Sequence, residues 1–174
     1  MMPRPAATLA CLACLALPAA AQEWSTVEFM ARGLKKGDPA QAYRGAVAAC
    51  LAGQGDVDKT AALFEKGGWT RSDEAEMGTV EYVGANADIY VLQADDGSFC
   101  AAYSEVQGTD TGLGNLQIVG GAAGLSFDHA LSDAGCDSYT LAPGILAEVT
   151  SSGNDPVCTD PATSQVRFSF GAGQ

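Results

Sequence analysis

Residues 88–106 read DIYVLQADDGSFCAAYSEV, and this stretch decides the fold. Two runs that are rich in β-branched and aromatic residues, 88–93 and 98–106, flank the triplet Asp95-Asp96-Gly97. Such runs joined by Asp-Gly are typical of a β-hairpin, because glycine readily adopts the positive φ that a tight turn needs. The sequence therefore predicts two antiparallel strands joined by a short turn at this point.

The hairpin belongs to a longer region in which apolar residues recur with a period of about two. Residues 79–83 are also rich in β-branched residues and tyrosine, and residues 145–151 and 165–170 alternate near the C-terminus. This period indicates a mostly antiparallel sheet from residue 69 onward. Successive side chains of a strand point to opposite faces, so every second residue should share one face. The residues that we expect to share a face within their strand are Val80 and Tyr82, then Phe99, Ala101 and Tyr103, then Val166, Phe168 and Phe170.

The residues before position 69 repeat with a period near 3.6 instead, which predicts helices. Ser25-Thr26-Val27-Glu28 matches a capping box and predicts a first helix that ends near Gly37. Asp38-Pro39 predicts the start of a second helix, because Asp is a good N-cap and Pro suits the first helical position. Asp56 is expected to cap a third helix, which Gly67-Gly68 would end.

Residues 107–129 give conflicting signals. Residues 107–115 are rich in Gly, Thr and Asp, and we interpret them as a loop. Leu113, Leu116 and Val119 have helical spacing, but the many nearby glycines oppose a helix by about 1 kcal/mol each relative to alanine. We therefore expect a poor helix over 116–129. Together the segments predict one α+β domain over 22–174, with N-terminal helices packed on a mostly antiparallel sheet.

The first 21 residues have the pattern of a secretory signal peptide. Arg4 supplies a positive start, residues 6–21 are almost wholly apolar, and Ala19-Ala20-Ala21 matches a cleavage site. The apolar run is shorter than the ~20 residues that a membrane-spanning helix needs. We therefore predict a signal peptide over 1–21, no membrane span after processing, and a periplasmic or secreted protein.

The cysteines support the same location. The only Cys-x-x-Cys, at 11–14, lies inside the predicted leader, so it cannot be a redox motif of the processed protein. Cys50, Cys100, Cys136 and Cys158 remain, and an even number in an exported protein predicts two disulfides. Three connectivities are possible. We favour Cys50–Cys100, which would join a helix to the sheet, and Cys136–Cys158, which would close a short C-terminal excursion.

The charge of the chain excludes some partners and suggests another. A net charge of −12 is unsuited to nucleic acid or to an anionic membrane surface. Residues 22–71 carry seven basic and six acidic groups, whereas residues 72–174 carry 15 acidic groups and one basic group, Arg167. The acidic half either keeps an exported protein in solution, or meets a basic protein partner or collects divalent cations.

Three local patterns resemble sites but lack parts. Asp110-Thr111-Gly112 has the letters of the aspartic-protease triplet, without the apolar pair that precedes it and without a second copy. His129 is the only histidine, which excludes a two-histidine zinc site, and its surroundings lack a nucleophile elbow. The turns at 95–96 and 154–155 offer oxygens to a calcium ion but lack EF-hand spacing. We retain Asp95, Asp96, Asp110, Asn154 and Asp155 as candidate ligand-binding residues, and we predict no catalytic residue, metal or cofactor.

Several short segments carry a resemblance. Ala49-Cys50-Leu51, Gly68-Trp69, Phe99-Cys100-Ala101 and the SGNDPVC of residues 152–158 together resemble small exported proteins of alphaproteobacteria whose function is uncharacterised. The likeness spans roughly residues 40–170. It implies export and a single domain, and no activity or site residue comes with it.

These observations favour a non-catalytic exported binding module with an acidic surface. One concrete form is an inhibitor-like role toward a basic protein partner, such as a cell-wall hydrolase. Two alternatives stay open. One is a small envelope hydrolase that uses acidic residues, and the other is a structural envelope protein without a specific ligand.

Overall fold

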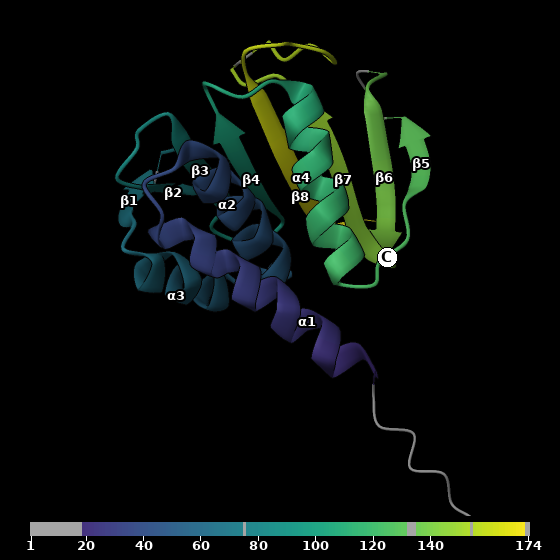
Figure 1. The fold of residues 1–174 in the computed structure, drawn as a ribbon, viewed down its shortest axis with the longest axis horizontal. Coiled ribbons are helices and arrows are strands. Elements are labelled where there is room, and N and C mark those ends of the chain that lie inside the picture. The colour runs from purple at the N-terminus through teal and green to yellow at the C-terminus, as the bar shows by residue number, and fades with distance from the viewer. Residues whose placement is uncertain (1–18, 75, 132–134, 154, 173–174) are drawn as a thin grey trace, which may run out of the picture.

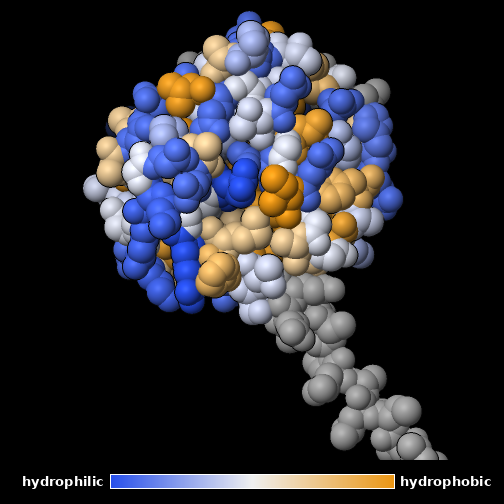
Figure 2. Space-filling model, viewed as in Figure 1, coloured by the Kyte–Doolittle hydropathy of each residue, from blue (hydrophilic) through white to orange (hydrophobic). Residues whose placement is uncertain are grey.

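The computed structural model describes residues 19–74, 76–131, 135–153 and 155–172, so most of the predicted leader lies outside the described residues. Four α-helices form one layer on one face of an eight-stranded antiparallel sheet, which confirms the predicted α+β class (Figure 1). Within the described residues, no helix has both the length and the apolarity to cross a bilayer. Figure 2 views the outer surface of the helix layer, where hydrophilic side chains surround smaller hydrophobic patches.

The helices begin and end largely where the capping residues predict. The Asp38 carboxylate accepts a hydrogen bond from the Gln41 amide, and Asp56 accepts one from Lys59, each at 2.9 Å. Gly68 ends its helix with a φ of 82°. These caps confirm the second and third predicted starts. The helical elements are α1 (Ala19–Met30), the 3-10 helix η1 (Ala31–Lys35), α2 (Pro39–Gly53), α3 (Val57–Gly67) and α4 (Thr109–Ala122).

The first helix begins earlier than predicted. It starts at Ala19 and runs through residues 25–28, so the capping-box start at Ser25 is wrong. The reason is local, because residues 19–23 are three alanines followed by Gln and Glu, all good helix formers. No N-cap is therefore needed at Ser25, and the helix continues into η1.

Helix α2 is the centre of the helix layer. Eleven of its 15 residues are buried, because the sheet lies on one side and α1, η1, α3 and α4 surround the rest. Small residues make this packing close: a Cβ at Gly45 would lie 2.6 Å from the backbone nitrogen of Leu34. The Tyr43 hydroxyl lies 3.0 Å from Ser164 Oγ, which joins α2 to the last strand. A helix that is buried on nearly every side needs the Ala-rich sequence that α2 has.

The sheet consists of two four-stranded meanders that meet at their last strands. The order is β1-β2-β3-β4-β8-β7-β6-β5, and every pair is antiparallel. Helix α2 packs on β3 and β4, and α4 packs on β7 and β8, so the chain repeats one arrangement twice. The strands are β1 (Thr70–Glu74), β2 (Thr79–Val83), β3 (Ile89–Ala94), β4 (Phe99–Ser104), β5 (Asp128–Leu131), β6 (Asp137–Ala142), β7 (Gly144–Thr150) and β8 (Ser164–Ala172).

Helix α4 differs from the prediction. It begins at Thr109, inside the segment that we interpreted as a loop, and residues 128–129 belong to β5 instead of a helix. Tertiary contacts explain the difference, since the glycines allow close packing. A Cβ at Gly112 would lie 3.2 Å from the Tyr43 hydroxyl, and one at Gly120 would lie 2.6 Å from the Phe127 ring. Packing therefore outweighs the low helix propensity of glycine.

Both disulfides have the connectivity that we favoured. Cys50–Cys100 joins α2 to β4, and both residues are fully buried between the layers. Cys136–Cys158 ties the residue before β6 to the loop between β7 and β8. The first bond therefore holds the two layers together, and the second fixes a surface loop.

Removing each disulfide in turn should lower the free energy of unfolding by a different amount. Replacing Cys50 and Cys100 by alanine opens a loop of 50 residues in the unfolded chain, which lowers the free energy of unfolding by about 4 kcal/mol. The same change at Cys136 and Cys158 opens a loop of 22 residues and lowers it by about 3 kcal/mol. Urea unfolding followed by circular dichroism measures both. A smaller loss from the first pair than from the second would contradict this dependence on loop length.

Candidate functional site

The sheet face opposite the helices carries the candidate site. No helix of the described ranges covers this face (Figure 1). Cross-strand register places Tyr90 beside Tyr103, and Ala101 between Leu92 and Arg167. Side chains alternate along a strand, and the intervening residues of these strands are buried in the core under the helices. The five residues therefore share the open face.

Two ring contacts occupy the centre of the open face. The Tyr90 and Tyr103 rings stack with centroids 4.6 Å apart and planes 2° apart. The Arg167 guanidinium carbon lies 4.4 Å from the centroid of the Phe99 ring. Phe99, Ala101 and Tyr103 thus lie on one face, as their alternation predicts, and that face is the open one. An aromatic centre on an uncovered sheet resembles the centre of a protein interface more than an ordinary solvated face.

Carboxylates flank this aromatic centre. Glu81 on β2 is in register with Leu92, and Glu148 on β7 is in register with Arg167. The Tyr90 hydroxyl donates a 3.3 Å hydrogen bond to Glu105. In the described part of the chain, Arg167 makes no ion pair within 4.0 Å. Three carboxylates and one cation therefore give the open face a negative charge.

The phenol of Tyr90 is held neutral by its surroundings. Burial is the main cause that raises its pKa, and the nearby Glu105 carboxylate raises it further by opposing a second negative charge. Burial also raises the pKa of Tyr103 beside it. Both phenols therefore stay neutral at neutral pH, and the Tyr90 hydroxyl donates its hydrogen to Glu105.

The structure does not bring the predicted ligand-binding residues together. Asp95 and Asp96 form the turn before β4, whereas Asp110 lies in the first turn of α4, after β4. Asp155 lies in the loop between β7 and β8, and Asn154 lies outside the described residues. Hydrogen bonds from the Ser98 hydroxyl and amide lower the pKa of Asp96, so its carboxylate serves the turn. No cluster of three or more His, Cys, Asp or Glu side chains in the described ranges is placed to hold a metal ion.

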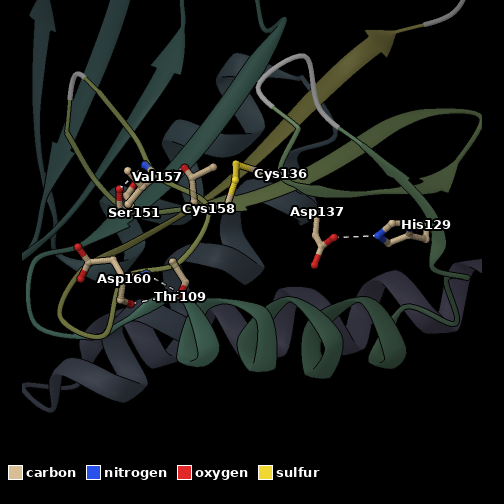
Figure 3. Close-up of a disulfide and its surroundings, with 9 residues drawn as sticks. Thr109, His129, Cys136, Asp137, Ser151, Val157, Cys158 and Asp160 are labelled. Carbon is tan, nitrogen blue, oxygen red and sulfur yellow. Dashed lines mark hydrogen bonds and ion pairs between the residues drawn. A yellow bond between two sulfur atoms is a disulfide. The ribbon is translucent and has the colours of Figure 1, made fainter.

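Polar groups of the loop between β7 and β8 bond within the loop and to the start of α4, as Figure 3 shows around the Cys136–Cys158 disulfide. The Thr109 amide donates to the Asp160 carbonyl at 2.9 Å, and the Val157 amide donates to Ser151 Oγ at 2.9 Å. Amides of the next turn donate to the Asp160 carboxylate and lower its pKa. These contacts hold the loop in place.

Among the residues that the structure describes, the single histidine forms no Ser-His-Asp triad. His129 Nε2 lies 2.9 Å from Asp137 Oδ1, and both side chains are exposed. In Figure 3 the disulfide lies between this pair and Ser151, and the histidine points toward Asp137. The pair links the edge strand β5, which carries His129, to its neighbour β6, which carries Asp137.

Sequence reasoning missed the open face. The alternation of residues 99–103 and the aromatic residues at 90 and 103 were visible signals. The period of a strand, however, does not tell which of its two faces the helices cover. The carboxylates in turns give a more familiar signal in the sequence, because turns often hold ligands.

Comparison with known proteins found no matching family model, no matching curated protein and no matching solved structure.

The tyrosines predict how stability changes with pH. Burial is the first cause that raises the pKa of all five, Tyr43, Tyr82, Tyr90, Tyr103 and Tyr139. A folded-state pKa above the unfolded value of about 10 stabilises the fold below that pH, and this stabilisation is lost as pH rises further. We expect the free energy of unfolding to fall above about pH 10, with phenolate absorbance appearing as the chain unfolds. Full phenolate absorbance near pH 10 in a folded chain would contradict this.

Proposed function

We propose that the protein is an exported, non-catalytic binding module whose open sheet face binds a basic protein partner. The observation that carries the proposal is the aromatic centre of that face, flanked by Glu81, Glu105 and Glu148. An inhibitor-like role toward a cell-wall hydrolase is one concrete form of this function.

The chemistry of the face supports a basic partner. Stacked tyrosines offer a large contact area at low cost in side-chain entropy, as they do in many interfaces. Lysine and arginine side chains of a partner can lie over such rings, and carboxylates at the rim can pair with them. The net charge of −12 also steers a cationic protein toward the molecule from a distance.

Two features support export. Two disulfides are typical of proteins from oxidising compartments, and residues 1–21 have the pattern of a secretory leader. A periplasmic or secreted location would place the open face where cell-wall hydrolases act.

A basic lysozyme is a suitable probe, because it represents the proposed class of partner. Changing Glu81→Gln and Glu148→Gln together should weaken binding by about threefold to tenfold, since each exposed ion pair contributes up to about 1 kcal/mol. Surface plasmon resonance at low and high salt measures the effect.

The matched control is Asp95→Asn with Asp96→Asn, which removes the same charge from a turn outside the aromatic centre. It should change binding by less than about twofold, because it leaves the open face intact. Equal weakening by both variants would reveal attraction by net charge alone and contradict a site on this face. Absence of lysozyme binding to the unchanged protein would contradict the proposal itself.

A further inference from the structure

Basic residues gather on the outer surface of the helix layer, on the side opposite the open sheet face. Residues 22–174 contain eight lysines and arginines, and five of them line two adjoining hollows of about 420 and 450 Å³. Figure 2 shows this surface, with deep blue residues beside orange ones over α1, α2 and α3. We call the two hollows together the cationic groove. It is lined by Ser25, Glu28, Phe29, Met30, Ala31, Arg32, Gly33, Lys35, Lys36, Gln41, Arg44, Leu63, Lys66 and Gly67.

The first hollow lies between α1 with η1 and α3. Phe29 and Arg32 face it from one side, at helical spacing, and Leu63 and Lys66 face it from the other. Lys35 stands at the η1 end. The hollow therefore combines an apolar wall with three cations.

The second hollow lies between η1 and α2. Met30 and Lys36 line one side, and Arg44 lines the other. Phe29 and Arg32 line both hollows, so they form the ridge between them. The Arg32 guanidinium carbon lies 4.6 Å from the centroid of the Phe29 ring, which keeps the charge beside an apolar surface.

The positive charge of the groove is not neutralised within the described part of the chain. Glu28 is the one carboxylate that lines the groove, and its Oε1 pairs with Lys59 Nζ at 3.0 Å. Arg32, Lys35 and Lys66 make no ion pair among the described residues. In a chain of net charge −12, such a cluster of unpaired cations indicates an anionic ligand.

The apolar side chains that line the groove indicate that the ligand has an apolar part as well as a negative charge. Phe29 is 61% exposed on this surface, and Leu63 is half-buried beside it. A purely ionic site would not need these side chains. A ligand that covers Phe29 would remove its ring from water, which favours binding by about 25 cal/mol per Å² of apolar surface.

We propose that the cationic groove binds a single-chain anionic amphiphile, such as a free fatty acid. The head group would lie against Arg32, Lys35 and Lys66, and the alkyl chain would lie along Phe29 and Leu63. The proposal concerns the helix layer and does not depend on the function that we propose for the open sheet face.

Size and net charge favour a small molecule over a larger anionic partner. The volume of each hollow falls within the range of about 300–1,000 Å³ that is usual for small-ligand sites. A net charge of −12 repels an anionic bilayer or an acidic protein as a whole, whereas a single carboxylate is repelled far less.

Titration calorimetry with dodecanoate below its critical micelle concentration tests the proposal. The unchanged protein should bind one dodecanoate, and Lys35→Gln with Lys66→Gln should weaken binding at least tenfold. Phe29→Ser should also weaken it severalfold, without loss of stability, because this side chain is already exposed.

Three controls make the result decisive. Arg71→Gln with Arg167→Gln removes two positive charges outside the groove and should change the affinity less than twofold. Acetate, which lacks the chain, and dodecyl maltoside, which lacks the charge, should bind at least tenfold more weakly than dodecanoate. Equal effects of the two double variants, equal binding of dodecyl maltoside, or binding to phosphatidylglycerol vesicles without binding to monomeric dodecanoate would each overturn the proposal. No detectable binding of dodecanoate would overturn it as well.

Discussion

The burial of α2 between the sheet and the other helices is the constraint on which the rest of the structure depends. Its small residues let η1 approach the helix backbone within van der Waals distance, and Cys50 bonds it to the middle of the sheet. Because α2 occupies this face, the alternating residues of β3, β4 and β8 on the same side are buried in the core. The opposite set of side chains is left on the uncovered face, so the position of α2 selects which residues form the candidate site.

Local signals in the sequence predicted the elements whose stability is local. The caps at Asp38 and Asp56 and the turn at Gly97 each depend on residues within a few positions, and all three lie where the sequence placed them. Helix α4 could not be predicted in this way, because its glycines are unfavourable in an isolated helix. Gly112 and Gly120 become favourable only when Tyr43 and Phe127 lie against them, and Tyr43 comes from a distant part of the chain.

The same distinction explains the candidate site. Period-two alternation showed that Phe99, Ala101 and Tyr103 share a face, but only the docking of the helices shows that this face is open. Charge separation was visible in the sequence as a near-neutral first segment and an acidic second one. The sequence could not show that five cations of the first segment line adjoining hollows, since they come from separate places in the helix layer: η1 and the residue after it, α2, and α3.

A two-layer fold turns this linear separation of charge into two surfaces that face opposite ways. The carboxylates at the open sheet face and the cations of the groove are separated by a helix layer and a sheet, which together span more than about 10 Å. The Debye length at physiological ionic strength is about 8 Å, so solvent ions largely screen each surface from the other. The two surfaces can therefore attract ligands of opposite charge independently. A fold with helices on both faces of the sheet would bury the aromatic centre, so the one-sided placement of the helices is what leaves the two charged surfaces on opposite sides of the molecule.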